Sequence, residues 1–227
     1  REAVDPTTAV DRDLDAEESD NYELGVRSRT LGWLSTELTA FQMDFHNQII
    51  TQAGQTTNGQ NPRHRGVEGA FDLSLTKLKD SVSGQATPKD AADLSVFFNV
   101  TMLETEFRTG PYYRNELPYA PRRQFNWGVR YARPHGFSGS LTANSVGRQF
   151  SDSANSQLET ANGTVGPIPA YTAWDLNLDY EIKEDLSAFL GVKNILNKEY
   201  FTTRESQKTG IVPAPEQSFQ VGISAKF

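Results

Sequence analysis

The sequence predicts an all-β fold, an antiparallel transmembrane β-barrel. The first observation is the alternation in residues 218–227, where Phe219 and every second residue after it are apolar and the residues between them are polar or small. Residues 173–182 alternate in the same way, with Trp174 and Tyr180 near the ends of their apolar face. A period of two puts each set on its own face of a sheet. Apolar residues toward lipid, polar residues toward the lumen and aromatic residues at the interfaces are typical of barrel strands.

The second observation concerns the connections, which alternate between short turns and long loops, apart from a turn of moderate length at residues 77–90. Short periplasmic turns and long extracellular loops are typical of outer-membrane barrels, whereas a soluble β-sandwich has shorter strands and no such alternation. Residues 1–21 are polar and acidic without periodicity, so we expect an extracellular loop or lead-in there and barrel over residues 22–227. We expect nine strands, at residues 22–26, 34–50, 67–75, 94–102, 124–131, 137–148, 172–182, 186–194 and 218–227.

The second expected strand is irregular. Its apolar positions change parity near Ala40 and Phe41, so that Met43 and Phe45 follow the opposite register from Leu38. This change indicates either a β-bulge or lumen-facing apolar residues that pack on something inside the barrel.

Composition excludes several classes of protein. The chain has 227 residues, of which 37% are hydrophobic, and a mean hydropathy of −0.57 without any long apolar run. These values exclude a transmembrane helix but not a barrel, because alternation lowers the apparent hydrophobicity of a strand. A net charge of −7 argues against a nucleic-acid partner. Without cysteine, the chain has neither disulfides nor thiolate metal sites.

Several stretches resemble the TonB-dependent outer-membrane receptors, and most closely their ferric-citrate and siderophore group. They are residues 21–28 (NYELGVRS), 63–73 (RHRGVEGAFDL), 173–180, 189–201 (FLGVKNILNKEYF) and 218–227 (SFQVGISAKF). The resemblance implies a barrel of about 22 strands filled by an N-terminal plug, in the outer membrane of a Gram-negative cell. The nine expected strands correspond to the last nine of such a barrel. We therefore expect the plug, the energy-coupling box and the earlier strands to be missing from this sequence.

The resemblance also implies a function, which is the import of a ferric chelate, ferric citrate or another siderophore, with energy from the TonB–ExbB–ExbD complex. The chelate would be the transported ligand, and the chain itself would bind no cofactor. The sequence contains no catalytic constellation, so we do not expect an enzyme. The alternatives are a passive outer-membrane channel, TonB-dependent uptake of haem, cobalamin or a saccharide, and a structural or adhesive barrel.

Basic and aromatic residues gather at the expected extracellular ends of the strands. Arginine suits an anionic chelate, because its planar guanidinium binds carboxylates through two charge-assisted hydrogen bonds. Arg122 and Arg148 follow the inward parity of their strands, which would place them above a plug. The alternative is that such arginines bind lipopolysaccharide phosphates or keep the loops soluble. The expected ligand-binding residues are Arg122, Arg148, Arg108, Arg204 and Tyr113.

Other charged residues give weaker signals. The three histidines have no metal-binding spacing, and the acidic run at residues 13–20 lacks the glycine and spacing of a calcium loop. We therefore expect no metal site. Lumen-facing charges would meet the plug of the resembled family or pair with each other across the barrel wall. They are Arg27, Glu68, Arg130, Asp175, Asp179 and Lys193.

Phe227 ends the apolar face of the last strand. In the resembled family, a C-terminal aromatic residue is part of the signal that the outer-membrane assembly machinery recognises. The alternative is that Phe227 is one more aromatic residue of the interfacial girdle.

Overall fold

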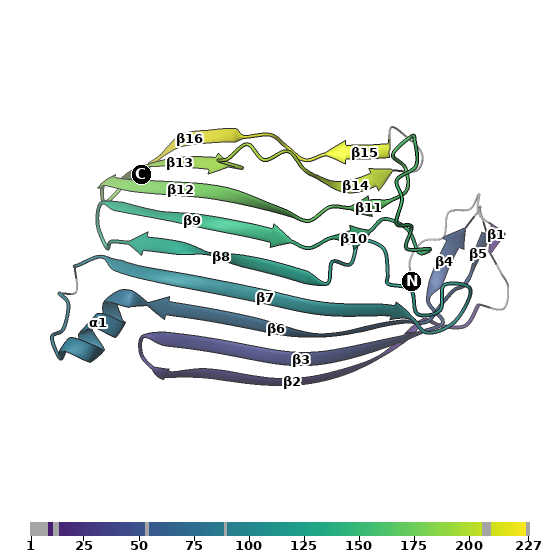
Figure 1. The fold of residues 1–227 in the computed structure, drawn as a ribbon. Helices are drawn as coiled ribbons and strands as arrows, with labels where there is room; N and C mark the ends of the chain where they lie inside the picture. The colour runs from purple at the N-terminus through teal and green to yellow at the C-terminus, as the bar shows by residue number, and fades with distance from the viewer. Residues whose placement is uncertain (1–8, 11–13, 53–54, 89, 206–209, 226–227) are drawn as a thin grey trace.

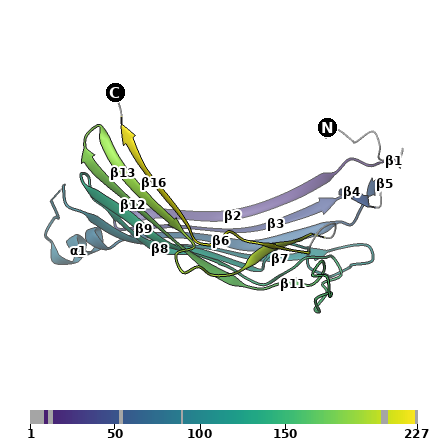
Figure 2. The same cartoon turned by 90° about the horizontal axis from the view of Figure 1, so that it is seen from above.

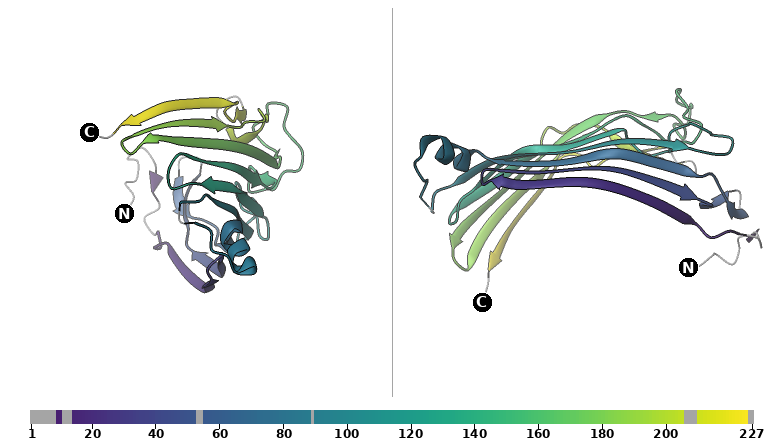
Figure 3. Two further views of the ribbon diagram at one scale, coloured as in Figure 1. Left: turned by 90° about the vertical axis from the view of Figure 1, so that its left-hand side faces the viewer. Right: turned by 90° about the horizontal axis from the view of Figure 1, so that it is seen from below.

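The computed structural model describes residues 9–10, 14–52, 55–88, 90–205 and 210–225. Its main element is a nine-stranded antiparallel sheet in the order β16-β13-β12-β9-β8-β7-β6-β3-β2, so the nine predicted strands are confirmed (Figure 1). Figure 3 shows the sheet as an open arc with β2 and β16 at its edges. The strands are β2 (Glu18–Leu31), β3 (Leu34–His46), β6 (Pro62–Ser74), β7 (Asp93–Phe107), β8 (Arg123–Ala132), β9 (Phe137–Val146), β12 (Tyr171–Lys183), β13 (Leu186–Lys193) and β16 (Ser218–Ala225).

The two ends of the sheet differ. Short connections and the helix α1 (Leu75–Ser83) lie at one end, which we call the turn end, and the long connections lie at the other, the loop end (Figures 1 and 2). The long connections, predicted as loops, contain short strands. These strands are β1 (Ala9–Val10), β4 (Ile49–Gln52), β5 (Gln55–Asn58), β10 (Gln149–Phe150), β11 (Pro167–Ile168), β14 (Phe201–Glu205) and β15 (Gly210–Pro213).

One face of the sheet is a continuous apolar belt. Residues directly opposite each other in an antiparallel pair share a face, so the register carries each row across the sheet. Aromatic rings strengthen the belt, with Trp127 and Trp174 at 4.8 Å between centroids and Phe98 stacked on Phe125 at 5.8 Å. One row runs through Leu34, Leu73, Val96, Val129, Leu141, Leu176, Val192 and Phe219. The predicted alternation is therefore confirmed for the described strands.

The other face is polar, and its charges pair across the wall. Arg27 binds Glu37 on the neighbouring strand at 2.7 Å, and Arg130 reaches across β7 to Asp72 at 2.6 Å. A chain of amides crosses β7, β8 and β9 and ends on the carboxylate of Asp175, through Asn99, Asn126 and Asn144. Cross-strand pairing, one of the two alternatives for the lumen-facing charges, is thus what the structure shows for Arg27 and Arg130.

Of the two interpretations of the parity change in β3, the bulge is wrong, and apolar residues on the polar, lumen-side face are confirmed. The register through Ala40 and Phe41 is unbroken on both sides of the strand, and the irregularity in this hairpin lies in β2, between Ser28 and Leu31. Phe41 and the alternate apolar residues after it therefore lie on the polar face. The strand also ends at His46 rather than at residue 50, because Asn47 adopts a φ of 53° that extended backbone does not allow.

The third strand ends one residue earlier than predicted, and part of the expected turn is helical. The hydroxyl of Ser74 accepts a hydrogen bond from the Lys77 amide at 3.1 Å, which caps the start of α1. Gly84 ends the helix in the left-handed region, with a φ of 70°. No helix among the described residues is long and apolar enough to cross a membrane.

The face assignment predicts unequal costs for arginine on β16. Val221 lies opposite Leu190 on the apolar belt, and the neighbouring Gln220 lies on the polar face opposite Gly191. We expect Val221→Arg to lower the free energy of unfolding in lipid by about 2–4 kcal/mol, because it places a charge against hydrocarbon, and Gln220→Arg to cost far less. Urea titration of the protein in lipid vesicles measures both values, and equal costs would contradict the assignment.

Candidate functional site at the loop end

Arginines and carboxylates alternate where β3, β6 and β7 reach the loop end. Arg63 binds Asp44 at 2.5 Å, and Arg65 binds Glu104 at 2.6 Å. The register puts these four residues on the face of the apolar belt, one or two steps beyond Val67. The belt therefore gives way here to a zone of paired charges.

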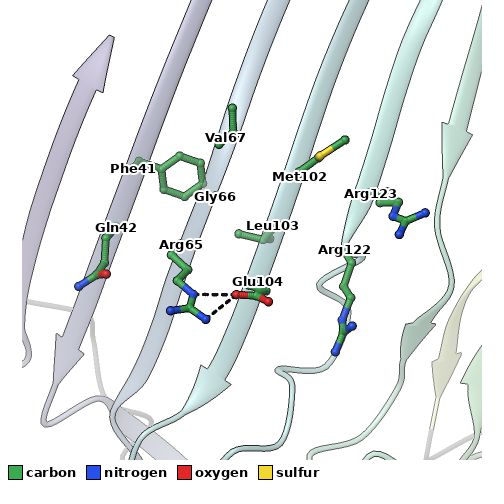
Figure 4. Close-up of a pocket in the computed structure, with 10 residues that line it drawn as sticks. All are labelled: Phe41, Gln42, Arg65, Gly66, Val67, Met102, Leu103, Glu104, Arg122 and Arg123. Atoms are coloured by element: carbon green, nitrogen blue, oxygen red, sulfur yellow. Dashed lines mark hydrogen bonds and ion pairs between the residues drawn. The ribbon is translucent and has the colours of Figure 1, made fainter.

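A groove of about 560 Å³ lies at this boundary (Figure 4). Arg65 and Glu104 form its charged side, and Val67 and Met102 form its apolar side. Arg123 lines this groove and also a second one of about 410 Å³. The remaining residues of the first groove are Phe41, Gln42, Gly66, Leu103 and Arg122.

Strand parity does not fix the orientation of Arg122, which was predicted to point inward. It lies one residue before β8, so the alternation of the strand does not set its direction. Its Nε and Nη2 donate to the two carboxylate oxygens of Glu116 at 2.9 and 2.8 Å, which raises the pKa of the arginine. It lines the first groove together with Arg65 and Glu104.

Arg148 also lies outside the strands, between β9 and β10, so strand parity does not orient it either. Its Nη2 donates to Oε1 of Gln157 at 2.7 Å, and its guanidinium lies 5.1 Å from the ring centre of Phe150. Within the described part of the chain it has no carboxylate partner, and it is exposed. Arg148 therefore presents an uncompensated positive charge at the loop end.

Arg108 and Tyr113 lie in the segment that follows β7. Arg108 donates to Oε1 of Glu106 at 2.8 Å. Tyr113 is about half exposed, and the guanidinium of Arg114 lies 5.3 Å from its ring centre. Arg114 belongs to the basic residues that the sequence places at the loop end, and among the described residues it forms no ion pair.

Arg204 differs most from its predicted role, because its side chain is only 1% exposed. It lies on β14 and holds the loop between β10 and β11. Nη1 donates to the carbonyl oxygen of Gly163 at 2.7 Å and to Oε1 of Glu159 at 3.1 Å, and Nη2 donates to the carbonyl oxygen of Pro167 at 2.9 Å. The hydrogen bond from Arg204 holds the pKa of the Glu159 carboxyl below its usual range.

Two further contacts join a third segment to this assembly. The hydroxyl of Tyr119 donates to the Arg204 carbonyl at 2.7 Å, and the Tyr119 amide donates to the Phe150 carbonyl at 2.8 Å. Gly210 packs so closely on Asn162 that a Cβ there would lie 2.3 Å from the Asn162 carbonyl oxygen. The loops that follow β7, β9 and β13 are thus fixed to one another around a buried guanidinium.

The C-terminal aromatic residue and the histidines are the other residues that the sequence singles out. Phe227 lies outside the described residues. His46 is 3.4 Å from Asp20 and His135 is 3.4 Å from Glu181, at opposite ends of the sheet. Among the described residues, no group of three or more histidine, aspartate or glutamate side chains could hold a metal ion.

Residues 3–195 match the family described as TonB dependent receptor-like, beta-barrel. The chain belongs to this family.

Curated relatives of this TonB-dependent receptor chain include two enterobactin receptors. The ferric enterobactin receptor PirA of Pseudomonas aeruginosa is 28% identical, and the match covers 94% of this chain and 28% of the relative. The ferrienterobactin receptor of Escherichia coli K12 is 26% identical, with 87% of this chain and 26% of the relative covered. The chain thus spans between a quarter and a third of the length of these relatives.

Solved structures agree on the fold. The ferric citrate transporter FecA in its unliganded form is 27% identical and superposes with a TM-score of 0.75 over 92% of this chain and 31% of FecA. The closed form of the ferric-catecholate import receptor Fiu from Escherichia coli K12 gives a TM-score of 0.71 at 19% identity, over 100% of this chain and 30% of Fiu. The nine-stranded sheet is therefore part of a larger barrel fold.

Membership in the TonB-dependent receptor family assigns the two faces and the location. Members are outer-membrane β-barrels and act as receptors and transporters rather than enzymes. The apolar belt accordingly faces lipid and the polar face lines the barrel lumen. Short turns lie at the periplasmic ends of such barrels and long loops at the extracellular ends, so the loop end is extracellular.

The buried position of Arg204 predicts a local effect of its substitution. Arg204→Met should lower the free energy of local opening of residues 151–166 by about 1.5–3 kcal/mol, because it removes charge-assisted hydrogen bonds from three acceptors. Hydrogen exchange on the receptor in lipid measures this opening. Arg133→Met, which removes an exposed arginine at the turn end, is the control. Unchanged protection in Arg204→Met would contradict the role.

The same contact predicts a pH dependence. Because the folded-state pKa of Glu159 is lowered, its contribution is present above the ordinary glutamate pKa and is lost as the pH falls through the lowered value. Protection of residues 151–166 should therefore decrease at acidic pH. In Glu159→Gln this decrease should be absent, and exchange rates of the two proteins measured from neutral to acidic pH test it.

Proposed function

We propose that this chain is part of an outer-membrane receptor that binds and imports a ferric chelate. The observation that carries the proposal is the set of guanidinium groups without carboxylate partners at the extracellular end, of which Arg114 and Arg148 lie in the loops. A ferric chelate built on carboxylates or catecholates presents negative charge and oxygen acceptors, which such groups bind well. The names of the relatives, two enterobactin receptors and a ferric citrate transporter, support the same class of ligand.

The predicted ligand-binding residues then take different roles. We assign direct contact with the chelate to Arg148 and Tyr113, with Arg114 beside the tyrosine ring. Arg108 and Arg122 are paired with Glu106 and Glu116, so a ligand carboxylate has to replace a protein carboxylate to reach them. Arg204 supports binding from within the loop assembly rather than by contact, because its side chain is buried.

The partners of the whole receptor belong to the same proposal. Energy for import comes from the TonB–ExbB–ExbD complex, through the plug that the resembled receptors carry N-terminal to the barrel. Arginines on the lipid-facing side contact lipopolysaccharide. The polar lumen wall, with Glu68, Asp179 and Lys193 outside any ion pair among the described residues, offers charges to the plug.

A passive channel is the competing function, and uptake of haem, cobalamin or a saccharide is another. Growth of a deletion strain on single iron sources separates them. Loss of growth on one ferric chelate, restored by the gene but not in a strain that lacks the TonB protein, supports energised import. Unimpaired growth on every ferric chelate tested would contradict the proposal.

Loss of one free guanidinium should weaken chelate binding. We expect Arg148→Ala to raise the dissociation constant of the ferric chelate that supports growth by roughly 10-fold to 150-fold, which corresponds to the loss of about 1.5–3 kcal/mol from a hydrogen bond to a charged group. Arg133→Ala is the matched control, because Arg133 is an exposed arginine at the turn end without an ion pair. Titration of the intact receptor gives both constants, and equal affinity in both variants would remove Arg148 from the site.

Phe227 is proposed to act in assembly rather than in transport. Its strand has to pair in order to close the barrel, and an unpaired strand edge is not tolerated in lipid. Deleting Phe227 should therefore lower the amount of folded receptor in the outer membrane and increase periplasmic degradation, while inserted molecules bind chelate normally. Heat-modifiable mobility on gels and binding per folded molecule measure the two effects. Normal folded levels with impaired binding would contradict the assignment.

A further inference from the structure

Met43 and His64 lie directly opposite each other on the neighbouring strands β3 and β6. Both are on the lumen face near the loop end, because Met43 is two residues from Phe41 and shares its face. Opposite residues of an antiparallel pair have Cβ atoms about 4.5–5.5 Å apart, so the two side chains are neighbours. The pair therefore brings a thioether sulfur and an imidazole nitrogen to one point of the lumen wall.

The imidazole of His64 has a ring nitrogen without a partner. Its Nε2 is shielded from solvent and makes no hydrogen bond within the part of the chain that the structure describes. On one side the ring of Phe45 lies 5.4 Å away between ring centres. Thr105, opposite His64 on β7, has its hydroxyl bound to the Leu117 amide at 3.0 Å. A neutral imidazole with its proton on Nδ1 thus keeps a free lone pair at Nε2, which is the donor that a metal ion requires.

The two donor atoms identify the class of metal. A thioether sulfur is a soft ligand that selects Cu(I), and an imidazole nitrogen also suits copper. Calcium and magnesium need several oxygen ligands, whereas the cross-strand neighbours of the pair on the lumen face are Asn21 and Thr105. The Glu23 carboxylate, on the same face of β2, accepts a hydrogen bond from the Asn21 side chain at 2.9 Å. One sulfur and one nitrogen suit Cu(I), which accepts a low coordination number.

We propose that Met43 Sδ and His64 Nε2 bind Cu(I) on the lumen wall near the extracellular end of the receptor. The side chain of Met43 is partly exposed, and its unbranched chain moves readily to admit an ion to the enclosed nitrogen. Phe41 and Phe45 flank Met43 on the same face of β3 and keep water from the pair. The site goes beyond the import of a ferric chelate and does not depend on it, because a chelate binds its iron through its own oxygen atoms.

Competitive titration tests the pair. The intact receptor in detergent is titrated with Cu(I) in the absence of oxygen, against a chelator that absorbs light when it holds Cu(I). Met43→Leu, which conserves side-chain volume, and His64→Gln should each weaken Cu(I) binding by at least about tenfold, since loss of even a supporting contact costs that much at a metal site. Ag(I), which has the same preference for sulfur and undergoes no oxidation in air, is the second probe and should give the same order of affinities.

The chain offers a matched control for each ligand. Met102→Leu removes the other methionine, which is exposed on the apolar belt opposite Val67. His46→Gln removes an imidazole at the end of β3 that lies 3.4 Å from Asp20. Both controls should bind Cu(I) as the unchanged receptor does. Heat-modifiable mobility compares the folded amounts of all variants, and chelate affinity is measured in the same samples.

X-ray absorption at the copper edge identifies the ligands directly. A sulfur ligand should be present in the unchanged receptor and in Met102→Leu, and absent in Met43→Leu. Weaker Cu(I) binding in both variants of the pair, with chelate affinity unchanged, supports the site even if the transported ligand proves to be something other than a ferric chelate. Equal Cu(I) affinity in Met43→Leu and Met102→Leu would overturn the proposal, and so would a copper-bound sulfur that persists in Met43→Leu.

Discussion

Backbone hydrogen bonding in the absence of water is the constraint on which this structure depends. Within hydrocarbon, the N–H and C=O groups of a strand can be satisfied only by neighbouring strands, so pairing has to continue from β2 to β16 without interruption. Continuous pairing fixes the register, and the register gathers every second residue into rows. The row from Leu34 to Phe219 and the amide chain ending at Asp175 are the two faces that result.

This constraint explains why the sheet could be predicted and where the prediction failed. Lipid accepts few polar side chains, so period-two alternation is nearly complete on the apolar face and strands are visible in the sequence. The lumen, by contrast, accepts both polar and apolar side chains. Phe41 and the apolar residues after it lie on that face without any bulge, and the apolar pattern alone could not decide between a bulge and lumen-facing residues. The helix α1 was missed although Ser74 and Gly84 are recognisable caps, because the segment was assigned only by its position between strands.

For the loop end, the sequence predicted which residue types gather there but not which residues contact each other. The sequence shows that arginines gather there, but the partner of each depends on contacts between distant segments, such as the bond from Arg204 to a carbonyl 41 residues away. Parity also does not extend beyond the last paired residue. Arg122 and Arg148 both lie just outside their strands, and the expectation that they point inward relied on a pattern that ends at the strand boundary.

Paired and unpaired arginines have different effects on the electrostatics of the loop end. Exposed pairs such as Arg65 with Glu104 and Arg122 with Glu116 contribute only about 0–1 kcal/mol each, so stability does not account for their alignment. Their effect is electrostatic. Each pair cancels a carboxylate that would otherwise repel an anion at the extracellular rim. The charges left uncompensated, such as Arg114 and Arg148 in the loops, then attract anions to this rim.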